Sequence, residues 1–171
     1  MSEKLLIFLE QNNFFYANQY GFRPKVSTNH AILAILNFIS KNLNSGKYVL
    51  LVLLDIRKCF DMLNHDILLK KLENYGVRGL ALQWFKSYFS GRKQRVFANG
   101  VLSSTLCDIL IGVLQGSILG VLLFLVFIND IFMANDDMVS YMFADDNSAA
   151  ISDNDLVSLI EKANIELDKL L

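Results

Sequence analysis

Two stretches of the chain carry the hydrophobic pattern of β-strands. Residues 47–54 are rich in leucine and valine and end at Asp55. A short apolar run of this kind predicts a strand that is buried on both faces. Residues 139–143 have large apolar side chains at alternate positions up to Asp145 and Asp146, and apolar residues resume shortly afterwards. This second pattern predicts a β-hairpin with two acidic residues at its tip.

Helical periodicity is clear in three stretches between these strands. The first expected helix begins after Asn64 as N-cap and ends at Gly76, with a hydrophobic staple across the cap. The second covers residues 80–89, where aromatic side chains recur at helical spacing. The third covers residues 117–132 and is apolar nearly all round, so we expect it to be buried.

Two short strands are expected between the second and third helices. Residues 94–98 and 105–111 have strand-like composition, and Asn99-Gly100 between them is typical of a tight hairpin turn. Together with the other elements, this pattern predicts an α+β fold with antiparallel pairing.

The end of the chain has the pattern of an amphipathic helix. Ser152 with Asp155 resembles a capping box, and apolar residues then recur on one face. The sequence ends while this pattern continues, so we expect the chain to be a fragment. Such a fragment would expose an apolar patch and self-associate.

Composition limits the function classes only loosely. The chain has 171 residues, 53% hydrophobic and 19% charged, which suits one domain with a substantial core. Its net charge of −1 gives no basic footprint for nucleic acid, unless the chain is the acidic part of a larger basic protein. The two cysteines form no metal or disulfide spacing, which favours an intracellular, reducing location.

The uncharged stretch of residues 109–129 is long enough to cross a membrane. Polar residues and glycines interrupt it, however, and its longest unbroken apolar run is Val121 to Ile128. The N-terminus has only a short apolar run between Glu3 and Glu10, which does not suit a signal peptide. We therefore expect no membrane association.

Three aspartates are candidates for catalysis. Asp55 follows one expected strand, and Asp145 and Asp146 stand at the tip of the expected hairpin. Carboxylates on rigid strands can hold two Mg²⁺ ions about 4 Å apart, the arrangement used for in-line phosphoryl displacement. Taken singly, Asp55 could be a strand-end cap and the acidic pair an ordinary turn. Spacing alone does not decide between these readings.

Four sequence motifs favour the catalytic interpretation, because they occur in the same order as in a known family. Residues 53–61 (LLDIRKCFD), 112–130 (GVLQGSILGVLLFLVFIND) and 143–146 (FADD) resemble motifs of non-LTR retrotransposon reverse transcriptases, and Tyr20-Gly21-Phe22-Arg23 also matches. The resemblance extends from about Asn18 to the end of the chain. It implies an RNA-directed DNA polymerase that uses an RNA template, a DNA primer and deoxynucleoside triphosphates. It also implies action in the nucleus.

The resemblance assigns a role to each matching residue. Metal ligands would be Asp55, Asp145, Asp146 and the backbone carbonyl of Ile56, holding two Mg²⁺ ions, with Mn²⁺ as an alternative. Nucleotide contacts would come from Phe60, a steric gate against the ribose 2′-hydroxyl, and from Gln115 and Gly116. Phosphate contacts could come from Arg57 and Lys58, and less readily from Arg23. Core packing is the alternative reading for Phe60, and solvated surface charge the alternative for the basic residues.

The implied architecture is a right-hand polymerase palm with part of the fingers and without the thumb. The palm core would cover about residues 46–152. Residues 1–45 would be a remnant of the fingers region, and residues 153–171 the start of the following helix. The remaining fingers, thumb and endonuclease segments would belong to a longer parent polyprotein.

Two other readings stay open. Leu114 and Val121 stand where the family has prolines, which suggests a looser nucleotide pocket and a degenerate, inactive reverse transcriptase fragment. The strand ending at Asp55 could also belong to a phospho-receiver domain. A receiver needs an acidic pair after an upstream strand, however, and neither Glu3 nor Glu10 follows a strand.

Overall fold

The computed structural model describes the whole chain except Gln115, Phe132, Ala134 and Leu171. It divides into two compact units. One consists of residues Met1–Phe14 and Lys58–Phe127, and the other of Phe15–Arg57 and Ile128–Leu171.

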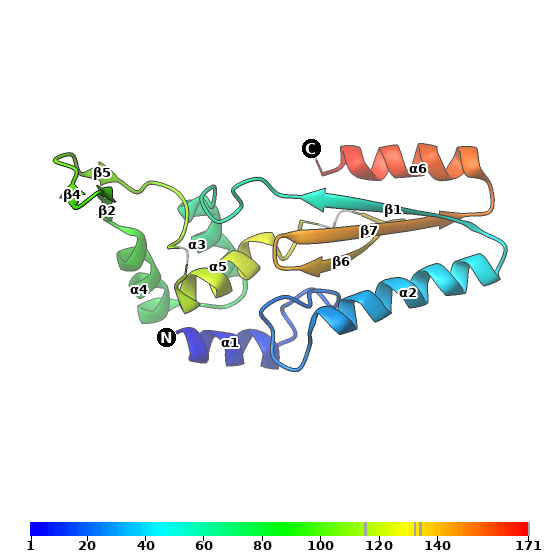
Figure 1. The fold of residues 1–171 in the computed structure, drawn as a ribbon. Coiled ribbons are helices and arrows are strands. Elements are labelled where there is room, and N and C mark those ends of the chain that lie inside the picture. Colours follow the sequence, from blue (N-terminus) through cyan, green and yellow to red (C-terminus); the bar gives the residue numbers. More distant parts are fainter. Residues whose placement is uncertain (115, 132, 134, 171) are drawn as a thin grey trace. The chain divides into compact units, whose positions relative to one another are not determined.

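The second unit is built on a three-stranded antiparallel sheet. Its strands are β1 (Tyr48–Asp55), β6 (Val139–Phe143) and β7 (Asp146–Asp153), in the order β1-β7-β6. The expected hairpin is confirmed as β6 and β7. Figure 1 shows α2 (Thr28–Asn44) and α6 (Leu156–Asp168) on opposite faces of this sheet. The unit therefore has three layers, with β7 as the central strand.

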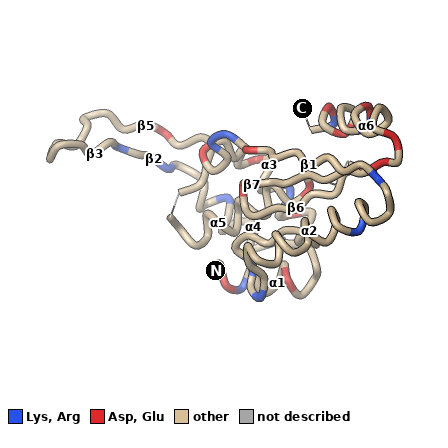
Figure 2. The backbone as a smooth tube through the Cα atoms, turned by 45° about the vertical axis from the view of Figure 1, so that its right-hand side comes forward, with Lys and Arg blue, Asp and Glu red and all other residues tan. Residues whose placement is uncertain are grey.

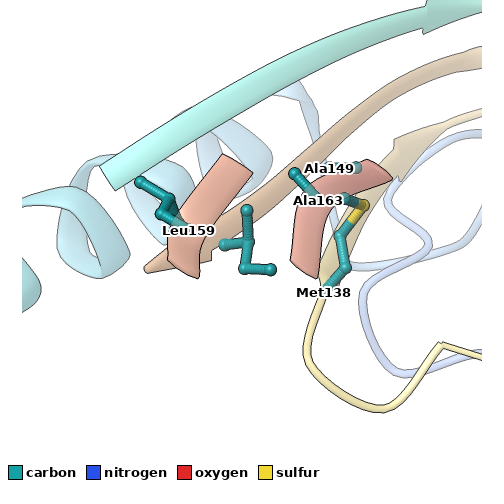
Figure 3. Close-up of a cluster of buried hydrophobic side chains, with 5 residues drawn as sticks. Met138, Ala149, Leu159 and Ala163 are labelled. Atoms are coloured by element: carbon teal, nitrogen blue, oxygen red, sulfur yellow. The ribbon is translucent and has the colours of Figure 1, made fainter. Parts of the chain in front are cut away.

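One hydrophobic cluster of this unit lies between the sheet and α6. Five buried side chains form it: Met138 just before β6, Ala149 and Ile151 of β7, and Leu159 and Ala163 of α6. Figure 3 shows Leu159 and Ala163 together with Met138 and Ala149. Small alanines on both the strand and the helix let the two backbones approach closely. Burial of such apolar surface stabilises the fold by roughly 25 cal/mol per Å².

The prediction that the first strand is buried on both faces is wrong. The side chains of β1 alternate between half-buried and exposed, and Leu53 is 73% exposed. The reason is that β1 is an edge strand with β7 as its neighbour. Leu50 and Leu54 pack against the core, whereas Leu51 and Leu53, on the opposite face of the strand, are exposed.

The expected capping box at the start of the last helix is also wrong. Asp155 is the N-cap, and its carboxylate accepts a hydrogen bond of 2.8 Å from the backbone N–H of Ser158. Ser152 is still in β7, and its hydroxyl donates instead to Asn42 of α2 at 2.8 Å. A salt bridge of 2.7 Å from Lys162 lowers the pKa of Asp153 well below its usual value, next to the same helix end.

The expected stripe on α6 is confirmed only in part. Leu159 and Ala163 are buried, but Leu156 and Ile160 are about half exposed. The apolar stripe on α6 is wider than the narrow sheet that it covers, so the outer residues of the stripe extend beyond the sheet.

Among its described residues, the first unit contains four helices. They are α1 (Ser2–Gln11), α3 (His65–Asn74), α4 (Gly79–Phe89) and most of α5 (Ile118–Ile128). The helices expected after Asn64 and over residues 80–89 are confirmed as α3 and α4. The side chain of Asn64 caps α3 by accepting from two backbone N–H groups, at 2.9 and 3.1 Å. Gly76 follows α3 with a positive φ of 91°, a conformation that favours glycine.

The apolar helix α5 is buried as expected, but it is shorter than the predicted 117–132. Its N-cap is Ser117, whose hydroxyl accepts a 2.9 Å hydrogen bond from the N–H of Gly120. All side chains from Leu122 to Val126 are buried. Among the described residues, no helix combines the length and apolar character needed to cross a bilayer.

The two strands expected before α5 are broken into shorter pieces. They form β2 (Lys93–Gln94) with β5 (Cys107–Asp108) and β3 (Phe97–Ala98) with β4 (Val101–Leu102). The predicted turn is confirmed, because Asn99 and Gly100 both have positive φ. In Figure 2 the basic β2 lies beside the acidic β5, where Lys93 and Asp108 form an ion pair at 3.4 Å.

An exposed apolar face on α2 leads to a testable prediction. Leu33 and Leu36 are each more than half exposed. We expect the purified chain to self-associate, and the double variant Leu33→Lys/Leu36→Lys to reduce light scattering and hydrophobic dye binding at neutral pH. The matched control is Asn37→Lys/Ser40→Lys, which adds the same charge on exposed positions of the same helix. An equal reduction by both pairs would show that net charge, and not apolar surface, governs association.

Candidate active site

Two candidate carboxylates lie opposite each other at one end of the sheet. Asp55 is the last residue of β1 and Asp146 is the first residue of β7, and the two are directly paired in the antiparallel register. Directly opposed residues have Cα atoms about 4.5–5.5 Å apart and side chains on the same face. Both aspartates are exposed to solvent. The fold thus brings together two acids that are far apart in the sequence.

The third acid belongs to the turn that joins β6 to β7. This connection consists of Ala144 and Asp145 alone, because Phe143 pairs with Asp146. Ala144 is buried and has a φ of 60°, a backbone conformation that residues other than glycine rarely adopt. Asp145 is half-buried beside it. The two-residue turn fixes the register of β6 against β7, whereas the pairing of β1 with β7 places Asp146 opposite Asp55.

An upstream segment, residues 18–21, supports this turn. Its backbone bonds to Met142 of β6: the N–H of Tyr20 donates to the carbonyl of Met142 at 2.7 Å, and the N–H of Met142 donates to Asn18 at 2.9 Å. The side-chain oxygen of Gln19 accepts from the N–H of Ala144 at 3.1 Å. No local sequence pattern points to Gln19, because its partner Ala144 lies far along the chain.

The donor set of this site suits a hard cation. Mg²⁺ is commonly held by one or two carboxylates, with substrate phosphates in its other positions. Asp55 and Asp146 supply such a pair, and Asp145 adjoins it along the chain. Within the part of the chain that the structure describes, no set of three or more His, Cys, Asp and Glu side chains is grouped to hold a metal ion. Asp55 and Asp146 alone would need oxygens from substrate or water to complete the coordination of an ion.

The candidate nucleotide-contacting residues belong to the other unit. Phe60 is half-buried, and its ring stacks on that of Phe124 in α5 with centroids 4.3 Å apart. Such stacking fixes the orientation of the Phe60 ring. Gly116 is exposed and has a φ of 79°, with open space where a side chain would lie. Gln115 lies outside the described residues.

The candidate phosphate-contacting residues differ in their surroundings. Arg57 and Lys58 are exposed, as expected for either a phosphate contact or a solvated surface charge. Arg23 is engaged within its own segment instead. Its guanidinium donates to the carbonyls of Tyr16 and Gln19, at 3.1 and 3.3 Å.

Comparison with known proteins identifies the family. Residues 1–167 match the sequence profile described as reverse transcriptase (RNA-dependent DNA polymerase). The chain is also 35% identical over 122 residues to the RNA-directed DNA polymerase from mobile element jockey of Drosophila funebris. That alignment covers 71% of this chain and 13% of the relative. The Drosophila melanogaster protein of the same name is 34% identical over 112 residues, covering 66% of this chain and 12% of the relative.

A solved structure supports the fold. Apo telomerase from Candida tropicalis, truncated from its C-terminal domain, superposes with a TM-score of 0.51 at 12% identity, over 98% of this chain and 35% of that one. At this identity the likeness concerns the fold alone. The expected resemblance to non-LTR reverse transcriptases is confirmed by the jockey proteins. The chain belongs to the reverse transcriptase family.

Proposed function

We propose that this chain is the palm, with part of the fingers, of an RNA-directed DNA polymerase from a non-LTR retroelement. The palm would cover about residues 46–152, with the fingers remnant in 1–45 and the start of the following helix in 153–171. The observation that carries the proposal is the pairing of Asp55 with Asp146 beside Asp145. A family match alone would leave open whether the acids can act together.

The proposed reaction is two-metal nucleotidyl transfer to a DNA 3′-hydroxyl. Asp55, Asp145, Asp146 and the carbonyl of Ile56 would hold two Mg²⁺ ions, or Mn²⁺ in their place. When bound, such ions favour the ionised 3′-hydroxyl and neutralise charge on the leaving pyrophosphate. The sheet holds the Asp55 and Asp146 carboxylates on one face, so little reorganisation is needed when substrate binds.

The remaining residues would select the nucleotide and the nucleic acid. Gln115 and Gly116 would lie against the nucleotide and the template base, and glycine allows a close backbone approach there. Arg57 and Lys58 would contact phosphates of the RNA template or DNA primer. Action in the nucleus follows from the proposed role in a retroelement.

Phe60 provides a test of nucleotide selection. We expect Phe60→Ala, in an enzyme with the upstream and downstream coding sequence restored, to raise ribonucleotide incorporation at least about tenfold relative to deoxynucleotides. The reason is steric, because an aromatic ring leaves no room for a 2′-hydroxyl and a methyl group does. The measurement is single-nucleotide extension with each nucleotide type.

The matched control is Phe60→Tyr, which keeps the ring and its stacking on Phe124. It should retain discrimination. Loss of a fully buried phenylalanine side chain commonly costs about 3–5 kcal/mol, and the half-buried Phe60 should cost less. If Phe60→Ala lowers stability and leaves ribonucleotide incorporation unchanged, Phe60 is a packing residue.

Primer extension on an RNA template tests the function as a whole. It should be run with the 171-residue chain and with the chain restored to the length of its relatives, of which it spans about an eighth. Extension that depends on Mg²⁺ or Mn²⁺ supports the proposal. Absence of extension in both forms would favour a degenerate reverse transcriptase fragment, in line with Leu114 and Val121 at the two proline positions.

A further inference from the structure

We infer that Gln19 is a positioning residue, which holds the Ala144–Asp145 turn and thereby the candidate catalytic carboxylates. This inference rests on the proposed function of those carboxylates. The residue itself touches neither a metal nor a reacting group. Gln19 would affect the position of the carboxylates through the backbone of the turn.

The first support is the hydrogen bonding of the Gln19 side chain. The residue is 2% exposed, and its amide oxygen accepts from the N–H of Gly21 at 2.8 Å and of Ala144 at 3.1 Å. A buried amide without partners costs several kcal/mol, so a side chain in this place is retained only where its bonds are made. Here one oxygen joins two segments that are more than a hundred residues apart in the sequence.

The second support is the close fit between the segment and the turn. Gln19 forms a parallel bridge with Met142, flanked by the two backbone hydrogen bonds of Asn18 and Tyr20. A side chain at Gly21 would place its Cβ 2.2 Å from the backbone nitrogen of Ala144. The segment therefore contacts the turn by backbone as well as by the Gln19 side chain.

The third support is the strain in the turn. Ala144 has a φ of 60°, and a non-glycine residue in this region is strained and persists only when its surroundings impose it. The Gln19 oxygen bonds directly to the N–H of this strained residue. Arg23 also holds residues 18–21 in place, because its guanidinium donates a hydrogen bond to the carbonyl of Gln19. The arrangement imposes on Ala144 the conformation that directs Asp145 and Asp146.

Amide hydrogen exchange in the 171-residue chain tests the inference without requiring activity. In Gln19→Met, which keeps the size but removes the acceptor, the N–H groups of Gly21 and Ala144 should exchange at least about tenfold faster. Gln19→Glu keeps an acceptor oxygen and should restore slow exchange at both. The matched control is Asn42→Leu, which removes a side-chain hydrogen bond to Ser152 at the other end of β7 and should leave both amides unchanged.

Mn²⁺ affinity, measured by water proton relaxation, shows whether Gln19 influences metal binding by the candidate catalytic carboxylates. Gln19→Met should weaken binding severalfold, and Asn42→Leu should not. The inference fails if exchange at Ala144 is unchanged in Gln19→Met, or if exchange rises equally along β1 and β7. It also fails if the turn loosens while Mn²⁺ affinity stays the same. A chain that binds no Mn²⁺ in its unsubstituted form contradicts the proposed metal site, whereas exchange still decides whether Gln19 holds the turn.

Discussion

Asp55→Asn or Asp145→Asn, in the enzyme with its flanking coding sequence restored, is expected to reduce DNA synthesis by at least about a thousandfold. Each change would remove a charged ligand of the proposed metal ions and keeps the shape of the side chain. A metal ion that stabilises transition-state charge contributes several kcal/mol, and about 4 kcal/mol corresponds to a factor of a thousand in rate. Asp146→Asn should be less damaging, because we expect the second acid of the pair to tune the site.

The measurement is primer extension at saturating nucleotide, with Asp168→Asn as control. Asp168 is an exposed acid at the end of α6, so its substitution makes the same change in charge away from the site. Near-normal synthesis by Asp145→Asn would contradict the metal assignment. A large loss in Asp146→Asn with little loss in Asp145→Asn would instead transfer the principal role to the acid that faces Asp55 in the sheet.

Elements with strong local signals could be predicted from the sequence. Asn64 and Gly76 mark the two ends of α3, and both act there as expected. Alternation up to the acidic pair predicts the β6–β7 hairpin, since side chains on successive strand residues point to opposite faces. These signals depend on a few neighbouring residues, which is why they hold without knowledge of the rest of the fold.

Features that depend on distant partners could not be predicted. A leucine-rich run indicates a strand, but whether both faces of β1 are covered depends on its place in the sheet, and it lies at the edge. No element was predicted in residues 1–45, where the structure has α1 and α2. The apolar residues of α2 are spread around the helix, and several are exposed, so its periodicity is blurred.

The candidate site also has some features that could be predicted from the sequence and others that could not. Strand-end positions and the resemblance point to Asp55, Asp145 and Asp146, but they leave open which of the pair faces Asp55. A change of one residue in register moves every side chain of a strand to the other face. The pairing of β1 with β7 places Asp146, and not Asp145, opposite Asp55. Gln19 escapes prediction altogether, because its partner at Ala144 is fixed by the tertiary fold.

Gly21→Ala is expected to destabilise the chain more than any surface substitution in this unit, by about 3 kcal/mol or more. Its Cβ would lie 2.2 Å from the nitrogen of Ala144 and 2.8 Å from the carbonyl carbon of Phe143, both backbone atoms that cannot rotate away. Overpacking against movable side chains costs about 1–3 kcal/mol, so a backbone clash should reach or exceed that range. The β6–β7 turn would have to separate from residues 18–21, and the bond from Ala144 to Gln19 would be lost.

Urea unfolding measures this cost, and Gly46→Ala is the matched control. Gly46 has a φ of 75° with open space around it, so alanine there adds backbone strain of about 1–2 kcal/mol without a clash. The φ of Gly21 lies outside the left-handed region, so alanine at that position adds a clash without that strain. We therefore expect Gly21→Ala to lower the urea midpoint further than Gly46→Ala does. If the two variants unfold in the reverse order, residues 18–21 do not pack closely against the Ala144–Asp145 turn in solution. The inferred role of Gln19 in holding that turn would then fail.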